Sequence, residues 1–247
     1  MKRVVIIVII VLYVVLSAGF IYFENINLVP AYANRLKFST IVLSALTAAF
    51  LWRYSIGKFD ATVLVICMAL TVATDVLLVF YASTHNVQGM LMYCIIKSIY
   101  FMRYQYDKEN RTLNWHRALV LPCFLIIPLT LLFLSRREGF FLYGHQYSTL
   151  IIVTSYYIQA LLAVIIFAVK SVRSGRYPRA NGLLILMGLG LFVIADVIVV
   201  LAQPADFIGL HDPIFIRMIW LFYTPSQALL AFSSYDFGGK LQPSAVR

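Results

Sequence analysis

Two aspartates lie within stretches that are otherwise apolar enough to cross a lipid bilayer. Asp75 lies in LTVATDVLLVF and Asp196 in LFVIADVIVVL. A carboxylate deep in a membrane helix is costly, and it persists mainly where it faces the bundle interior, pairs with another group or takes part in chemistry. The other acidic residues fall in predicted connections, at span edges or in the C-terminal tail. The two aspartates therefore constrain both the fold and the function of this chain.

The composition is typical of a membrane protein. Of the 247 residues, 62% are hydrophobic and 12% are charged, and the mean hydropathy is +0.88. Charged residues are about half as frequent as in soluble domains, and a soluble fold of this length could not bury so much apolar surface. The net charge of +10 arises from Lys and Arg in short segments between apolar runs, a pattern that sets membrane topology. We therefore expect the bilayer, and no nucleic acid, as the partner.

Eight apolar runs are long enough to form membrane helices. We expect an all-α, polytopic membrane helix bundle, multi-pass in the cell (plasma or inner) membrane, with residues 1–247 forming a single integral membrane domain. The expected spans are 3–23, 36–52, 60–81, 88–103, 117–135, 149–169, 181–202 and 213–233. The first run begins like a signal peptide, but it has no small-residue cleavage site and is expected to remain as a helix.

The distribution of Lys and Arg predicts the orientation. With the N-terminus inside, the inner segments carry 14 of these residues, whereas the outer loops carry four, namely Arg35, Lys37, Arg136 and Arg137. This excess predicts that both termini are cytoplasmic. Asp75 and Asp196 then both lie roughly 9 Å below the outer boundary, at about 1.5 Å per residue. Two carboxylates at one depth can meet if their helices are neighbours.

Polar residues in the predicted outer half form a candidate site with the two aspartates. The set is Asp75, Asp196, Lys97, Tyr93, Tyr100, Tyr156, Arg217, Tyr223 and Gln227. In the functional interpretation, one carboxyl stays protonated in desolvated surroundings and acts as general acid, while the other stays ionised. In the structural alternative, Asp75 pairs with Lys97. Asp196 then pairs with Arg217, and the tyrosines pack helices or lie at the membrane interface.

Several other chemistries lack the residues that they need. The four histidines lie in or beside predicted loops, and the three cysteines lie within predicted spans. Neither set has the spacing of a metal site or a disulfide framework. The sequence also has no G-x-S-x-G elbow and no glycine-rich phosphate loop. We therefore expect no metal and no cofactor.

Three sequence blocks resemble the YhhN family of small eight-helix membrane proteins, which includes the lysoplasmalogenases. Over residues 60–105 and 185–233, the blocks are ATDVLLVF with Gly89, Tyr93, Lys97 and Tyr100, then GLGLFVIAD with Gly188, Phe192 and Asp196, then FYTPSQALLAF with Tyr223 and Gln227. The chain departs from the family pattern where Thr74 replaces a glycine, Ala195 a serine, Lys97 a histidine and Thr224 a tyrosine.

The resemblance implies cleavage of the vinyl-ether bond of lysoplasmalogens, a membrane lipid substrate, with Asp75 and Asp196 as catalytic residues. Lys97 would hold Asp75 in its ionised form and leave Asp196 as the acid. A non-enzymatic alternative is a small transporter or lipid-binding membrane protein whose aspartates couple protons or bind a cation. In a third interpretation, the polar set only stabilises the bundle.

Overall fold

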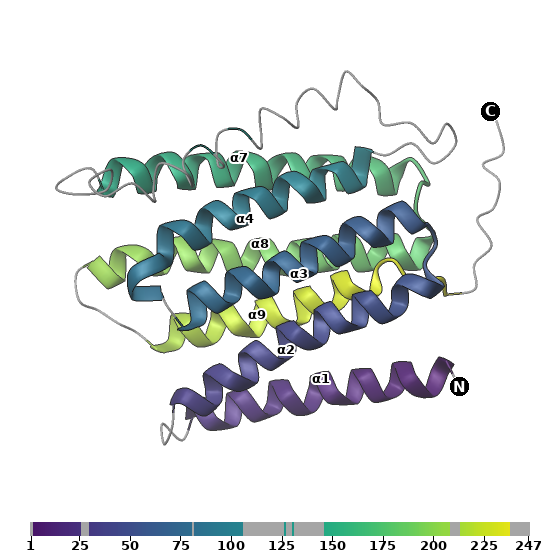
Figure 1. The fold of residues 1–247 in the computed structure, drawn as a ribbon, viewed down its shortest axis with the longest axis horizontal. Helices are drawn as coiled ribbons and strands as arrows, with labels where there is room; N and C mark the ends of the chain where they lie inside the picture. Colours follow the sequence, from purple (N-terminus) through teal and green to yellow (C-terminus); the bar gives the residue numbers. More distant parts are fainter. Residues whose placement is uncertain are drawn as a thin grey trace. The chain divides into compact units, whose positions relative to one another are not determined.

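The part of the chain that the computed structural model describes is helical. The described residues are 2–25, 30–80, 82–105, 146–207 and 213–237, together with Ile126 and Thr130. Within these ranges the elements are α1 (Lys2–Asn25), α2 (Pro30–Leu51), η1 (Trp52–Tyr54), α3 (Lys58–Phe80), α4 (Ala82–Gln105), α7 (Gln146–Arg173), α8 (Arg179–Phe207) and α9 (Pro213–Phe232) (Figure 1). No strand forms in these ranges, which confirms the all-α class.

Five helices are long and apolar enough to cross a membrane. Within the described ranges they cover Val4–Glu24, Tyr32–Tyr54, Lys58–Phe80, Val153–Arg173 and Arg179–Val199. They support the predicted class of membrane protein. The predicted spans 88–103 and 213–233 are also helical, as parts of α4 and α9. The predicted span 117–135 lies outside the described residues apart from Ile126 and Thr130, so the count of eight helices and the placement of the termini stay predictions.

Helix ends differ most from the predicted span ends at the starts of α4 and α2. α4 begins at Ala82, so residues predicted as an outer loop belong to its first turns. α2 begins at Pro30 rather than at residue 36, and Pro is favoured at the first position of a helix because it has no N–H to leave unpaired. Arg35 and Lys37 therefore both lie within α2, and counting them in an outer loop was wrong; Lys37 already fell inside the predicted span 36–52. Hydropathy measures the apolar length of a span, but polar residues can extend a helix beyond it.

The chain forms two compact units, each described by itself. The first unit contains α1, α2, η1, α8 and α9, and the second contains α3, α4 and α7. The expectation of one integral membrane domain stays a prediction.

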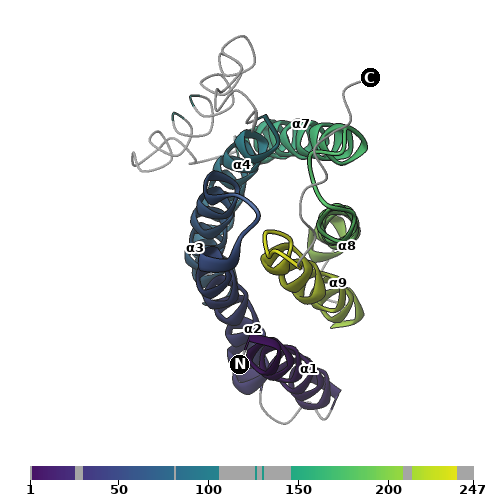
Figure 2. The same cartoon turned by 90° about the vertical axis from the view of Figure 1, so that its right-hand side faces the viewer.

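In the second unit, α4 lies between α3 and α7 (Figure 2). α3 and α4 form an antiparallel hairpin, in which the Cys67 thiol donates to the backbone carbonyl of Ile96 at 3.8 Å. Between α4 and α7, the rings of Phe101 and Phe167 pack edge to face with centroids 4.8 Å apart. Such edge-to-face pairs add to the stabilisation from apolar burial alone.

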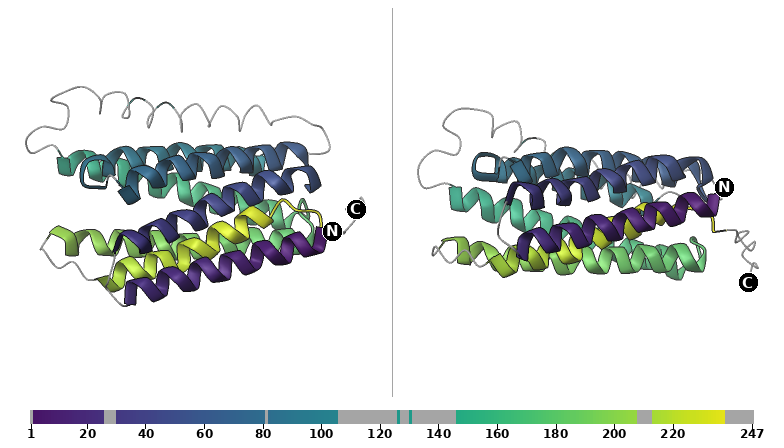
Figure 3. Two further views of the ribbon diagram at one scale, coloured as in Figure 1. Left: turned by 60° about the horizontal axis from the view of Figure 1, so that its bottom comes forward. Right: turned by 90° about the horizontal axis from the view of Figure 1, so that it is seen from below.

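In the first unit, α2 contacts both α1 and α9, and α1 lies beside α9 (Figure 3). The hydroxyl of Tyr13 on α1 donates to Ser44 on α2 at 2.9 Å. Gly188 lets α8 approach α9 closely, because a Cβ at this position would lie 2.9 Å from Cγ of Leu230. The Asn181 side chain, near the start of α8, donates to the backbone carbonyl of Ser233 at 2.8 Å and so holds the segment after α9.

Candidate functional site

Asp75 is buried on α3 and accepts a hydrogen bond from α4. Its residue is 3% exposed, and the Tyr93 hydroxyl donates to Oδ1 at 2.6 Å. The neighbouring Thr71 and Thr74 donate to carbonyls of their own helix, from Cys67 and Leu70. These threonines are therefore tolerated in an apolar helix without a partner from another helix. Two predicted site residues, Tyr93 and Asp75, are therefore directly hydrogen-bonded to each other.

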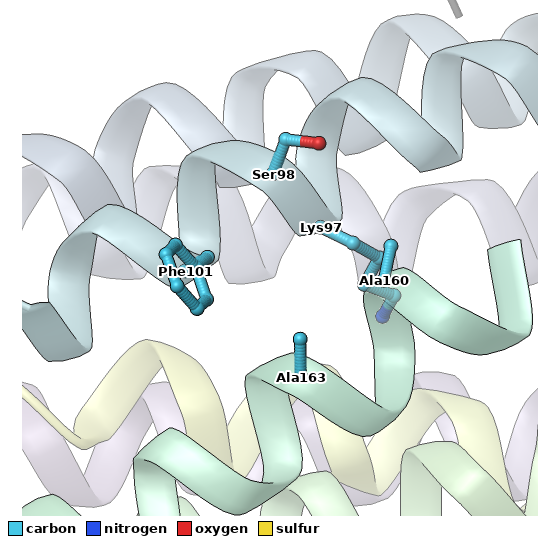
Figure 4. A pocket seen from close by; sticks show the side chains of 5 residues that line it. All are labelled: Lys97, Ser98, Phe101, Ala160 and Ala163. Atoms are coloured by element: carbon cyan, nitrogen blue, oxygen red, sulfur yellow. The ribbon is translucent and has the colours of Figure 1, made fainter. Parts of the chain in front are cut away.

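Lys97 lies one turn after Tyr93 on α4 and is also buried. Its ammonium nitrogen is 6.0 Å from the centroid of the Tyr157 ring on α7, and this ring packs edge to face with Tyr93. Together with Ala160 and Ala163 of α7, Lys97 lines a space that is too narrow for a water molecule (Figure 4). The amino group of Lys97 therefore lies near the Tyr157 ring of α7, one helical turn after Tyr93 in the sequence of α4.

Asp196 lies half-buried on α8, one turn after Phe192. The Phe192 ring packs against Tyr223 of α9 with centroids 5.6 Å apart, and Tyr223 packs against Trp220 at 5.5 Å. Because α8 and α9 are antiparallel, Asp196 lies at about the level of these aromatic rings. Gln227, a turn further along α9, is buried.

Arg217, near the start of α9, belongs to a charged cluster at one end of the first unit. Its Nη2 donates to the backbone carbonyl of Glu24 on α1 at 3.1 Å. The Glu24 carboxylate forms a salt bridge with Lys37 of α2, which is 2% exposed and lies 5.4 Å from the ring centroid of Trp220. Two cations and one carboxylate leave the cluster with an excess of positive charge. The sequence prediction missed this cluster, because it placed Glu24 at a span edge and Lys37 in a loop.

A second charged cluster that the sequence prediction missed links the start of α3 to the end of α4. Arg103 in the last turn of α4 donates from Nε and Nη2 to the two carboxylate oxygens of Asp60 in the first turn of α3, at 2.9 Å each. The Tyr177 hydroxyl donates to Oδ1 of Asp60 at 2.7 Å. All three residues are buried, and the pKa of the Tyr177 phenol is raised well above 10.0 by burial and by the Asp60 carboxylate. A signal for this pair was present in the sequence. If the two predicted helices pack antiparallel, Asp60 at the start of the first lies opposite Arg103 at the end of the second.

The predicted site residues fall into two sets. Asp75, Tyr93 and Lys97 belong to the second unit, as do Tyr156 on α7 and Tyr100 on α4. Tyr100 lies seven residues beyond Tyr93, or about 10 Å along the helix, so it does not join the Asp75–Tyr93 hydrogen bond. The other set, in the first unit, comprises Asp196, Arg217, Tyr223 and Gln227. Among the described residues, no group of three His, Cys, Asp or Glu could hold a metal ion.

The fold and these buried ionisable residues define a helical membrane protein with polar groups inside its apolar helices. The sequence model of the YhhN family matches residues 34–234, most of the chain. The protein therefore belongs to the YhhN family, which is associated with hydrolase activity, and the predicted resemblance is confirmed. No curated protein and no solved structure matches the chain.

Proposed function

We propose that this protein is an integral membrane hydrolase that cleaves the vinyl-ether bond of lysoplasmalogens or of a related lysolipid. The observation that carries the proposal is Asp75, a carboxylate 3% exposed in an apolar helix, with the Tyr93 hydroxyl at 2.6 Å, in a chain of the YhhN family. Ionisable groups in membrane helices are rare and mark functional sites. The products would be a fatty aldehyde and a glycerophospho-headgroup.

Two carboxyl groups suit this reaction. An acid protonates the vinyl carbon, which gives an oxocarbenium ion, and water then adds to that ion and releases its proton. A neutral carboxyl can supply the first proton, and a carboxylate can stabilise the cation and take up the proton of the attacking water, as in glycosidases. The resulting hemiacetal breaks down to the aldehyde and the alcohol. The reaction needs no metal or organic cofactor in this scheme.

The hydrogen bond from Tyr93 favours the carboxylate role for Asp75. A hydroxyl that donates to a carboxylate stabilises its negative charge, and we assign Lys97, one turn after Tyr93 on α4, to act in the same direction. We therefore assign Asp75 to stabilise the cation and activate water, and Asp196 to act as the acid. Asp75 and Asp196 belong to separate compact units, so their joint action on one substrate is proposed from the sequence and the family pattern.

The charged cluster of Glu24, Lys37 and Arg217 suits the phosphate of the lysolipid. Its excess positive charge complements a phosphate, and a guanidinium binds phosphate through several N–H donors. From the level of Asp196 on α8 to Arg217 on α9 is about 3–8 Å along the helix axis. Only a few bonds separate the phosphate of a lysoplasmalogen from its vinyl ether, so Arg217 can hold the headgroup while Asp196 acts on the bond.

Proton- or cation-coupled transport is a second candidate, because the buried ionised pair of Asp60 and Arg103 is also typical of transporters. The two candidates predict different products. A hydrolase releases fatty aldehyde from a lysoplasmalogen in detergent, whereas a transporter moves protons or a cation across a liposome membrane and releases no aldehyde. Aldehyde release by the purified protein is therefore the test of the proposed function.

A further inference from the structure

We propose that the α3–α4 interface holds a chain of ordered water molecules that links the Asp60–Arg103 cluster to Asp75. The proposed role of the water chain is to deliver water to the Asp75 carboxylate, and this role rests on the proposed hydrolase. The water chain itself can be tested without turnover. Its evidence lies entirely within the second unit.

Three polar side chains of α4 are buried without a hydrogen-bond partner among the described residues. They are the hydroxyls of Tyr100 and Tyr104 and both polar atoms of the Gln105 amide. Their residues are 4%, 2% and 3% exposed. Proteins pair nearly all buried polar groups, and ordered water satisfies those that other protein groups do not reach. Four such atoms within two turns of one helix therefore indicate water.

Polar side chains continue from this group towards Asp75 on both helices. Along α4 the polar positions are Tyr104, Tyr100, Lys97 and Tyr93, at the spacing of one helix face, and along α3 they are Asp60, Cys67, Thr71 and Asp75. Hydrogen bonds from Arg103 to Asp60, from Cys67 to Ile96 and from Tyr93 to Asp75 join the helices at three levels. The polar positions thus extend about 22 Å, from Asp60 to Asp75.

The proposed reaction explains why such a chain would be useful. Each vinyl-ether bond that is cleaved consumes one water molecule, and Asp75, which would activate that water, is almost fully buried. Water must therefore reach Asp75 through the protein. The Asp60–Arg103 ion pair and the Tyr177 hydroxyl supply a polar end from which the chain begins.

Hydroxyl-radical labelling by X-ray pulses tests the water chain, because radicals formed from bound water modify the adjacent side chains. The wild-type protein in detergent is labelled and analysed by mass spectrometry. Tyr13 is the matched control, since it is also buried but its hydroxyl is bonded to Ser44. We expect Tyr100 and Tyr104 to be labelled several-fold faster than Tyr13. Labelling of both as slow as that of Tyr13 would overturn the proposal.

Replacing one proposed water ligand gives a second test. In Tyr100→Phe, labelling of Tyr104 should fall several-fold while that of Tyr13 stays unchanged; unchanged labelling of Tyr104 removes Tyr100 from the chain and contradicts the proposed path. Failure of the proposed hydrolase function can be distinguished from failure of the water-chain proposal. Fast labelling in a protein that releases no aldehyde supports the water chain and refutes the hydrolase, and slow labelling in an active enzyme does the reverse.

Discussion

The hydroxyl of Tyr93 on α4 lies 2.6 Å from Oδ1 of Asp75 on α3, and 18 residues of chain separate the two. This hydrogen bond fixes the carboxylate within an otherwise apolar helix. It also supplies a donor whose hydrogen bond is stronger when the carboxyl is ionised. The pair links α3 to α4 at one of the two predicted catalytic carboxylates.

Tyr93→Phe should lower kcat with little change in KM, because the variant removes a donor to the charged carboxylate but no group assigned to the lipid. A hydrogen bond to a charged group contributes about 1.5–3 kcal/mol, or about a 10- to 150-fold change in rate. The measurement is steady-state aldehyde release across pH. The exposed Tyr22 provides the control variant Tyr22→Phe, which should keep the wild-type rate. Equal kcat in Tyr93→Phe and wild type would contradict the role of the hydrogen bond.

Arg217→Gln should raise KM for the phosphate-bearing substrate more than it lowers kcat. A charge-assisted hydrogen bond to phosphate contributes about 1.5–3 kcal/mol, so KM should rise about tenfold or more. The matched control is Arg35→Gln, which changes an exposed arginine of α2. The assignment of Arg217 to the headgroup fails if the two variants have the same KM.

Breaking the buried pair of Asp60 and Arg103 should destabilise the protein. Either Asp60→Asn or Arg103→Met leaves a buried charge without its partner, which costs about 3–5 kcal/mol, whereas replacing both by apolar residues should restore most of the loss. Thermal unfolding in detergent measures both effects. Asp236→Asn, at an exposed residue, is the control and should change stability little. A double variant as unstable as the two single variants combined would contradict this account.

Tyr177 should make stability fall at alkaline pH. Its pKa in the folded protein is raised well above 10.0, whereas an unfolded tyrosine titrates at about 10. Above that pH the unfolded chain loses the proton that the folded protein retains, so the free energy of unfolding decreases as pH rises. Tyr177→Phe cannot titrate, and its free energy of unfolding should decline less steeply than that of wild type above about pH 10. Parallel curves for the two proteins would show that Tyr177 does not contribute.

Hydropathy predicted the helices because an apolar run of membrane length carries a strong local signal. Five of the predicted spans correspond to described helices that can cross a membrane, and Asp75 and Tyr93 were both among the predicted site residues. The hydrogen bond between these two residues was not predicted, because it depends on the register of α3 against α4. A run of apolar residues contains no information about that register.

The surroundings of charged residues near helix ends were harder to predict from the sequence than the helices themselves. Asp60 and Lys37 were assigned to span edges or loops, where charge is expected to be solvated, yet both are buried in ion pairs. Their partners, Arg103 and Glu24, lie on other helices, and Arg103 is 43 residues from Asp60. Such pairs form through tertiary packing. Hydropathy, which is assigned residue by residue, therefore contains no information about which charged residues will pair. Pairing charges across a predicted helical hairpin would have recovered the Asp60–Arg103 pair.

Aldehyde release from a lysoplasmalogen by the purified wild-type protein tests the proposed two-aspartate hydrolase, beside Asp75→Asn, Asp196→Asn and the exposed control Asp236→Asn. Each variant keeps the side-chain shape and removes the carboxylate, and thermal unfolding verifies that all four proteins are folded. We expect release by wild type and Asp236→Asn, and near-complete loss in the other two variants. Wild-type rates in Asp75→Asn or Asp196→Asn, or no release by the folded wild type, would contradict the proposed hydrolase.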